Sequence, residues 1–303
     1  MVRALSAVAL SPEVAAALSA GRPVVALETT LVTHGLPHPE GLATAEAMEA
    51  AVRAAGALPA TIGILDGNLR VGLDAAERAR LAGDGSTVKV NLGNLAAVLA
   101  GGGSGSTTVA ATMLAAHRAG IRVFATGGVG GVHRGGSGDV SADLLALARF
   151  PVAVVCAGAK AVLDLPRTVE ALETLGVPVF GWRTDRFPAF DRRDSGLPVD
   201  RAFQDIGELA AAVALHLELG AGGALVNNPI TAEHEVDVAL HERALQESLA
   251  AAEREGVRGR DLTPFLLAQM RDRTAGATLA ANRALLLSNA RLAGELACAL
   301  AKN

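Results

Sequence analysis

Short apolar runs alternate with longer alanine-rich stretches along most of the chain. The apolar runs have the length and the β-branched content of buried strands, and the alanine-rich stretches repeat their apolar positions at helical spacing. This pattern predicts strands at residues 24–28, 61–65, 68–72, 88–90, 123–126, 152–157, 177–180 and 224–226. It predicts helices at residues 12–20, 41–55, 74–81, 107–119, 141–149, 167–175, 206–219, 233–255, 264–273 and 277–300.

The order of these elements indicates the fold class. Strands separated by helix-length segments are typical of a three-layer α/β/α protein with a largely parallel central sheet. Asp66-Gly67 lies between two short apolar runs and predicts a hairpin, so we expect the sheet to be mixed. No repeat, low-complexity linker or change in composition divides the sequence, which favours a single domain over residues 1–303.

Polar residues gather where the predicted strands end. In open α/β sheets, ligands bind beyond the carboxyl ends of the strands. In this sequence those ends carry Glu28, Thr126, Lys160 and Asn227-Asn228. We therefore expect a binding or catalytic site at this edge of the sheet.

The composition narrows the class of protein. Half of the 303 residues are hydrophobic and 19% are charged, with a mean hydropathy of +0.35, which excludes a disordered chain. The net charge of −4 gives no basic field for a nucleic acid polymer, so any phosphate recognition must be local. The longest uncharged stretch, between Lys89 and Arg118, contains asparagines, a histidine and a glycine-serine run, and predicts no membrane span.

The N-terminus and the cysteines indicate the compartment. The first 21 residues superficially resemble a signal peptide, but Ser11-Pro12-Glu13 interrupts the apolar core and is typical of a helix start. Cys156 and Cys298 are too few for a disulfide framework or a multi-cysteine zinc site. We therefore expect a soluble protein of the reducing cytoplasm.

Lysine is rare in this chain. Of the 27 basic residues only Lys89, Lys160 and Lys302 are lysines, and the other 24 are arginines. Lys89 and Lys160 occur in apolar, strand-like sequence, whereas Lys302 is in the tail. A primary amine can lose its proton and become a nucleophile, which a guanidinium cannot. The preference for arginine over lysine therefore suggests that Lys89 or Lys160 is kept for the reactivity of its amine. The alternative is that these two lysines are retained by chance.

Two residues at strand ends are candidates for catalysis. Glu28 follows apolar neighbours that would raise its pKa and make it a proton donor near neutral pH, although a carboxylate here can also simply cap the next turn. Lys160 follows Ala-Gly-Ala at the end of a predicted strand, a suitable place for a Schiff-base lysine. The alternative is a lysine that extends from the rim of the sheet into solvent.

The glycine-rich segment at residues 126–143 favours phosphate or sugar phosphate binding. Its glycines leave backbone amides accessible, His133 and Arg134 add donors, and Ser141 begins a helix whose N-terminus attracts anions. The segment lacks the spacing of a Walker loop or a Rossmann fingerprint. Asp139 and Asp143 suit a hard divalent cation that keeps several waters, whereas helix capping by Asp139 is the competing explanation.

Other features give weaker signals. His34 and His38 have the spacing of a helical metal pair, but the glycine and proline between them argue against a helix and hence against a metal site. The aromatic and charged run at residues 182–193 is more typical of an ordered loop or subunit contact. Residues 101–106 either bring backbone amides to a ligand or only lead into a helix. Asn282, on an alanine-rich helix, is either a functional amide or a surface residue.

Taken in chain order, several stretches match one known family. They run almost from end to end: PVVALETTLVTHGLPHPE, GALPATIGILDGNLRVGL, GSTTVAATM, AGIRVFATGGVGGVHRG, DVSADL, PVAVVCAGAK, GVPVFGWRTDRFPAF, LVNNPI and TPFLLAQM. With these stretches the chain resembles the pseudouridine-5′-phosphate glycosidase family, which includes the indigoidine-synthase-A-like proteins.

The resemblance implies a lyase with glycosidase activity. Such an enzyme reversibly cleaves the C–C glycosidic bond of pseudouridine 5′-phosphate to uracil and ribose 5-phosphate, through a lysine imine (Schiff base) at C1′ of the opened ribose. The family also implies a three-layer α/β/α fold, a divalent metal, typically Mn²⁺, and a homotrimer.

The resemblance also assigns roles to residues. Lys160 matches the nucleophile, Glu28 the proton donor and Asp139 the metal ligand. The matching substrate-binding positions, together with the neighbouring polar residues that we assign to the same site, are Lys89, Val109, Thr126, His133, Arg134, Ser141, Ala142, Asp143 and Asn282.

This chain departs from the family pattern in two places. Residues 91–94 stand where family members carry a basic pair, and the loop before Asp139 is shortened to residues 135–138. Two other functions stay open: a different lysine-imine reaction on a sugar phosphate, such as an aldolase-type cleavage, and a non-catalytic sugar-phosphate or nucleotide binding protein.

Overall fold

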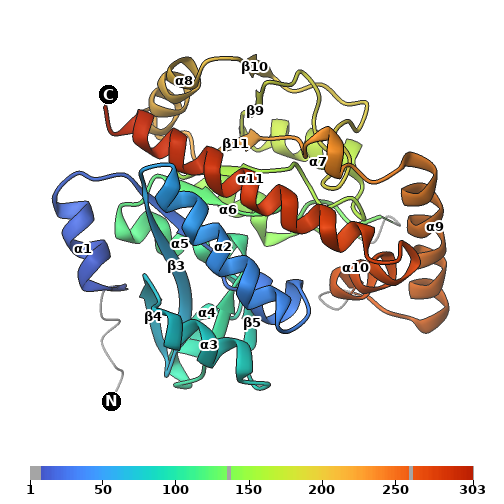
Figure 1. Cartoon of the computed structure of the whole chain (residues 1–303), viewed down its shortest axis with the longest axis horizontal. Helices are drawn as coiled ribbons and strands as arrows, with labels where there is room; N and C mark the ends of the chain where they lie inside the picture. The colour runs from blue at the N-terminus through green and yellow to red at the C-terminus, as the bar shows by residue number, and fades with distance from the viewer. Residues whose placement is uncertain (1–7, 135–137, 259–261, 303) are drawn as a thin grey trace.

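The protein has a central sheet with helices on both faces (Figure 1). The computed structural model describes residues 8–134, 138–258 and 262–302. The first seven residues of the signal-peptide-like stretch and residues 135–137 of the shortened loop lie outside these ranges. The strands are β1 (Ala9–Leu10), β2 (Val24–Leu27), β3 (Leu58–Leu65), β4 (Asn68–Val71), β5 (Val88–Val90), β6 (Gly105–Thr107), β7 (Val123–Ala125), β8 (Ala153–Cys156), β9 (Val179–Trp182), β10 (Arg201–Phe203) and β11 (Ala224–Asn227).

The strand order is β1-β4-β3-β2-β7-β8-β11-β9-β10, with β6 paired to β3 and β5 to β6. All pairs from β3 through β2, β7, β8, β11 and β9 to β10 are parallel. The first half of β3 pairs in parallel with β2, and its second half pairs antiparallel with β4 and β6. The predicted mixed, largely parallel sheet is therefore confirmed.

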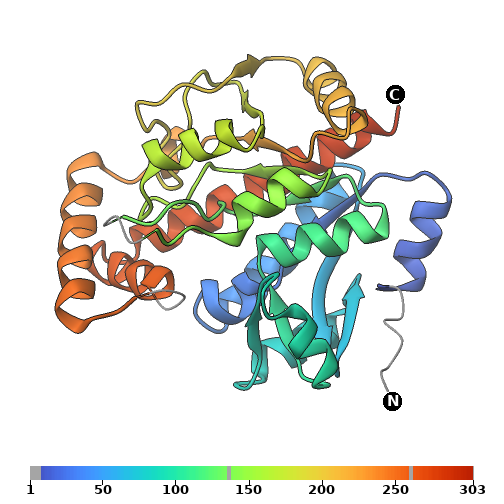
Figure 2. The same cartoon turned by 180° about the vertical axis from the view of Figure 1, so that it is seen from behind.

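Helices cover both faces of this sheet and complete the three layers. They are α1 (Pro12–Ser19), α2 (Glu40–Ala54), α3 (Ala75–Gly83), α4 (Leu95–Ala100), α5 (Val109–Ala119), α6 (Ala142–Arg149), α7 (Leu165–Thr174), α8 (Ile206–Glu218), α9 (Val238–Glu255), α10 (Leu262–Arg273) and α11 (Ala277–Leu300), with a π-helical turn η1 (Leu31–Gly35) and a 3₁₀ turn η2 (Ala232–His234). In Figure 1, α2 and α11 cross the front of the sheet, and α8 lies at the upper left beside the C-terminal end of α11 and packs into the same core. Figure 2 shows α5, α6 and α7 on the opposite face. Within the described residues, no helix has both the length and the apolar character needed to cross a membrane.

The central strands are apolar throughout because both of their faces are buried. In β2, Val24 and Ala26 belong to the core under α1, α5, α6 and α7, whereas Val25 and Leu27 belong to the core under α2, α8 and α11. This alternation follows from the period of two along a strand. The continuous apolar run in the sequence is thus the mark of a strand between two helical layers.

The predicted hairpin forms between β3 and β4. Asp66 and Gly67 have φ values of 51° and 70°, the left-handed conformation of both central residues in a type I′ turn. Aspartate and glycine tolerate this conformation better than most residues, which is why the dipeptide predicts the turn.

The predicted elements differ from the observed ones in a few places. Residues 107–119 were expected to form one helix, but Gly105–Thr107 forms β6 and the helix begins at Val109. The expected helix at residues 233–255 is divided, because Asp237 caps α9 by accepting from the amide of Leu240 at 2.9 Å. The short elements β1, β10 and α4 lie in regions for which the sequence predicted no element.

Candidate active site

Three neighbouring strands bring the predicted catalytic groups to one edge of the sheet. Glu28 follows β2, Thr126 follows β7, and Lys160 lies four residues after the end of β8. Because β2, β7 and β8 are adjacent and parallel, their carboxyl ends meet at the same edge. The positive charge of Lys160 acts on the Glu28 carboxyl, which places the two side chains within electrostatic reach of each other.

The Glu28 carboxyl is held by its neighbours and removed from water. The Thr126 hydroxyl donates to Glu28 Oε1 at 2.5 Å. Burial raises the pKa of Glu28, and the charge of Lys160 and the Thr126 hydrogen bond oppose that rise only in part. A carboxyl with a raised pKa stays protonated at a higher pH, which suits a proton donor.

Thr126 is itself fixed by two asparagines. Asn289, fully buried on α11, donates from Nδ2 to the Thr126 carbonyl at 2.8 Å. Asn228, after β11, donates to Asn289 Oδ1 at 3.0 Å. Asn228 was singled out by its place at a strand end, whereas Asn289 was not. Asn289 follows Asn282 by seven residues, two helical turns on the same face, and that spacing is the signal that identifies it.

The backbone before Lys160 has little freedom. Gly158 adopts a left-handed φ of 78°, and a Cβ there would lie 2.0 Å from the Pro188 carbonyl oxygen. Lys160 then donates its amide to the Val129 carbonyl at 3.1 Å, which joins the end of β8 to the glycine-rich segment. The glycine of the Ala-Gly-Ala motif thus lets the chain turn tightly before the lysine.

Asp143 organises the glycine-rich segment. One carboxylate oxygen accepts from the Ala110 amide at 3.0 Å, and the other accepts from the Gly130 amide at 2.8 Å. These bonds join the first turns of α5 and α6 to the loop. The two helix N-termini, at Val109 and Ala142, therefore lie close together, and such N-termini favour a phosphate group.

Asp143, predicted as part of the substrate-binding stretch, has contacts that suit a structural role. The residue is 6% exposed, its carboxylate is already bonded to two amides, and a negative charge would repel a phosphate. Asp143 is therefore suited to positioning the amides around the site. Ser141 caps α6 by accepting from the Asp143 amide at 3.2 Å, and Gly130 approaches it so closely that a Cβ would lie 2.3 Å from the Ser141 hydroxyl.

Replacing Asp143 by alanine is expected to destabilise the fold by about 2–4 kcal/mol, because two buried amides lose a charged acceptor. The measurement is urea unfolding of the variant and the wild type. Asp205→Ala is the matched control, because Asp205 also accepts from two amides but is exposed at the start of α8, and its loss should cost about 1 kcal/mol. Equal losses in the two variants would contradict the positioning role of Asp143.

Lys89, His133 and Asp139 lie around the same centre. The positive charge of Lys89, in β5, is close enough to affect the pKa values of both Glu28 and His133. The charge of Asp139 affects the pKa of His133, and the His133 amide donates to the Asp139 carbonyl at 3.0 Å. Burial, with the charges of Lys160 and Lys89, lowers the pKa of His133 against the opposite effect of Asp139. Arg134 differs from these residues: it is exposed, and its Nε donates to the Val162 carbonyl at 3.3 Å.

The residues around Asp139 fit one mode of divalent metal binding. Among the described residues, no group of three or more His, Cys, Asp or Glu side chains is placed to hold a metal. A cation bound by one carboxylate, several waters and the substrate phosphate needs no such group. Asp139 is half-buried beside the converging helix N-termini, so its carboxylate suits that mode.

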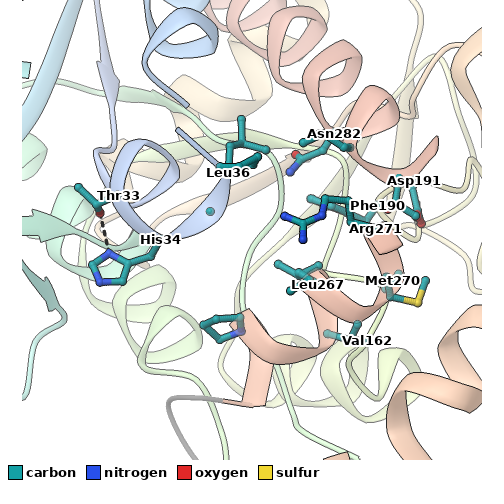
Figure 3. A pocket seen from close by; sticks show the side chains of 17 residues that line it. Thr33, His34, Leu36, Val162, Phe190, Asp191, Leu267, Met270, Arg271 and Asn282 are labelled. Carbon is teal, nitrogen blue, oxygen red and sulfur yellow. Dashed lines mark hydrogen bonds between the residues drawn. The ribbon is translucent and has the colours of Figure 1, made fainter. Parts of the chain in front are cut away.

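A cavity of about 230 Å³ opens beside these groups (Figure 3). Thr33–Pro37, which follow Glu28 in the chain, form one side, and Ala161 and Val162, which follow Lys160, form part of another. Asn282 lines the cavity from α11, and its Oδ1 would lie 3.3 Å from a Cβ on Gly127, the residue after Thr126. The predicted asparagine is therefore beside the edge of the sheet that carries Glu28, Thr126 and Lys160.

Several cavity residues were not expected from the sequence as parts of a substrate site. His34 was considered only as a metal ligand. It lies in the π-helical turn η1, where its Nδ1 is 2.6 Å from the Thr33 hydroxyl and 3.3 Å from that of Ser106. Burial and the charge of Lys89 lower its pKa. Phe190, from the aromatic run, and Arg271, on α10, also line the cavity.

Known proteins match this chain over nearly its whole length. Residues 13–299 match the family described as indigoidine synthase A like protein. The pseudouridine-5′-phosphate glycosidase of Rhodospirillum centenum is 59% identical over 97% of this chain and 92% of its own, and that of Sorangium cellulosum is 51% identical over 97% and 93%.

Two solved structures share the fold. The prealnumycin C-glycosynthase AlnA, in complex with ribulose 5-phosphate, gives a TM-score of 0.91 at 43% identity over 98% of each chain. An indigoidine synthase A-like protein from Thermotoga maritima gives a TM-score of 0.86 at 38% identity, over 93% of this chain and 94% of its own.

Proposed function

The chain belongs to the indigoidine-synthase-A-like family, and from that membership we propose that it is a pseudouridine-5′-phosphate glycosidase. The reaction is the reversible cleavage of the C–C bond between C1′ of the ribose and C5 of uracil, with ribose 5-phosphate as the other product. The observation that carries the proposal is the placement of an amine, Lys160, and a carboxyl with a raised pKa, Glu28, after the two strands β8 and β2 that flank β7, at the same edge of the sheet.

The first chemical step opens the sugar ring. The neutral Lys160 amine forms a bond to C1′ while the C1′–O4′ bond breaks, and Glu28 gives its proton to O4′. The resulting secondary ammonium returns a proton to the Glu28 carboxylate. Lys160 is then bonded to C1′ as an amine, and Glu28 is again an acid.

The second step breaks the C–C bond. Glu28 donates its proton to C5 of the base, and the nitrogen lone pair forms the C1′=N bond as C1′ separates from C5. The nitrogen lone pair stabilises the positive charge that develops at C1′ as the C1′–C5 bond electrons leave with the uracil. Water then adds to C1′, ribose 5-phosphate leaves, and the lysine amine and the Glu28 acid are restored.

The phosphate group gives the enzyme a distant point of attachment. The N-termini of α5 and α6, the glycine-rich loop and Lys89 supply amides and positive charge close to one another. Binding energy from the phosphate is available to orient C1′ against Lys160, which raises the rate of the chemical steps.

We propose that Asp139 holds the divalent cation, with Mn²⁺ the expected ion. When bound, the cation neutralises phosphate charge and helps to fix the position of the substrate. Asp139→Ala is expected to raise the Mn²⁺ concentration for half-maximal uracil release by at least about tenfold. A titration of activity with Mn²⁺ measures this effect, and an unchanged titration would remove Asp139 from the site. Asp194→Ala, at an exposed loop residue, is the control.

The homotrimer and the cytoplasmic location stay predictions. Both rest on the sequence, and the oligomeric state is measurable by light scattering of the purified protein.

Uracil release from pseudouridine 5′-phosphate tests the proposed function. Ultraviolet absorbance or chromatography should detect one uracil for each ribose 5-phosphate formed. Imine formation with ribose 5-phosphate but no uracil release would favour a different lysine-imine reaction, such as an aldolase-type cleavage. Binding of ribose 5-phosphate without imine formation would favour a binding protein.

A further inference from the structure

The cavity beside the catalytic edge has the character of a site for a planar ring rather than for a phosphate. Most of its walls are apolar, from Leu36, Val162, Phe190, Leu267, Met270 and Leu279. The amides and cations suited to the phosphate lie instead at the N-termini of α5 and α6 and around Lys89. Ala161, the residue after Lys160, lines the cavity, and Asn282 on its wall lies beside Gly127, the residue after Thr126, so a ring held in the cavity would have one edge near C1′ of the sugar.

Besides Thr33, His34, Asp191 and Thr278, two polar residues with different hydrogen-bonding abilities line the cavity, Arg271 and Asn282. Figure 3 shows that the side chains of Arg271 and Asn282 both extend toward the cavity, from α10 and α11. Asn282 has a carboxamide, which donates and accepts and so can pair with either a carbonyl or an N–H group. Arg271 has a guanidinium, which only donates.

Asp272 fixes the orientation of the Arg271 guanidinium. Its Oδ1 accepts from Nε and lies 2.8 Å from both Nε and Nη2 of Arg271. This contact uses one edge of the planar group; the Arg271 side chain is 36% exposed and that of Asp272 is 62% exposed. A base bound in the cavity would exclude water from the free edge of the guanidinium, and a charged hydrogen bond made there is stronger than one in bulk solvent.

We propose that Arg271 is a specificity residue, which recognises a ring carbonyl of the base and rejects bases that carry an amino group at that place. A carbonyl oxygen accepts from the guanidinium, whereas an amino group would leave two donors facing each other. The proposal rests on the function proposed above. It adds that selection between oxo and amino pyrimidines is made by α10, an element that carries none of the catalytic residues.

The test uses two substrates and one substitution. Wild-type protein is compared with Arg271→Met on pseudouridine 5′-phosphate and on pseudocytidine 5′-phosphate, in which an amino group replaces the 4-carbonyl. Loss of a charged hydrogen bond to the bound base predicts that kcat/KM for the uracil substrate falls by about 10- to 100-fold. The kcat/KM for the amino substrate should fall much less, so the ratio of the two kcat/KM values, which measures the preference for uracil, should approach one.

Two readouts separate this inference from the proposed function. Ribose 5-phosphate carries no base, so borohydride should trap it on Lys160 in Arg271→Met as efficiently as in the wild type. Equal trapping also shows that the variant is folded. Arg283→Met, at an exposed position on α11, is the matched control and should retain the wild-type preference. An unchanged uracil preference in Arg271→Met would overturn the inference, whereas absence of uracil release by the wild type would overturn the proposed function.

Discussion

Replacing Lys160 by alanine is expected to lower kcat for uracil release by at least about 10³-fold, because the reaction then has no nucleophile to form the imine. The substitution removes a half-buried side chain at a strand end, where the Lys160 backbone remains bonded to Val129. The fold should therefore be retained. Initial rates of uracil release, together with thermal unfolding of the same preparation, measure both effects.

Lys302→Ala is the control for Lys160→Ala. Lys302 is exposed near the C-terminus, so its loss removes an amine from the protein without touching the site, and full activity is expected. If Lys160→Ala kept more than about a tenth of the wild-type kcat while folded, the lysine would not be the nucleophile.

Replacing Glu28 by glutamine is expected to lower kcat by about 10²- to 10⁴-fold, because a positioned proton donor is lost while the shape of the side chain is kept. The wild-type activity that depends on protonated Glu28 should decline as pH rises through its raised pKa. In Glu28→Gln this limb of the pH profile should disappear. A pH profile of kcat for both proteins measures the effect, and an identical alkaline limb in the two would contradict the assignment.

The same carboxyl should make the protein less stable at higher pH. Because folding raises the pKa of Glu28 above its ordinary value of 4.5, the folded protein keeps a proton that the unfolded chain has lost. Stability from this group is therefore complete below pH 4.5 and is lost as pH rises through the raised pKa. Relative to wild type, Glu28→Gln should become more stable as pH rises, whereas Glu255→Gln, at the exposed end of α9, should show no such trend.

The layers of the fold could be predicted because the core has a simple pattern. Strands buried on both faces read as unbroken apolar runs, and Asp66-Gly67 specified the antiparallel turn by its local conformational preference. The short strands β1, β6 and β10 could not be predicted in this way. Their two or three residues carry little periodicity, and their pairing with distant strands defines them. A single domain over residues 1–303 stays a prediction.

The position of the site was predictable for a related reason. The carboxyl ends of parallel strands meet at one edge, so a polar residue after each strand indicates a site before any contact is known. Glu28, Thr126 and Lys160 were found by that rule, and the structure places them on neighbouring strands.

The features of the candidate site that the sequence did not indicate depend on tertiary contacts. The Asp143 carboxylate accepts hydrogen bonds from the amides of Gly130 and Ala110, and Ala110 is 33 residues away on another helix. The sequence does not show these bonds, so the carboxylate was considered available for a ligand or metal. Nothing in the sequence distinguishes Arg271 from the other arginines of the chain. It becomes a candidate only because α10 and α11 bring Arg271 and Asn282 to the same cavity.

Borohydride reduction in the presence of ribose 5-phosphate, followed by peptide mass mapping, tests the imine most directly. A stable adduct with the mass of the reduced pentose phosphate should appear on the peptide that contains Lys160, and on no peptide that contains Lys89 or Lys302. An adduct on a different lysine, or saturation with ribose 5-phosphate without any adduct, would contradict the account.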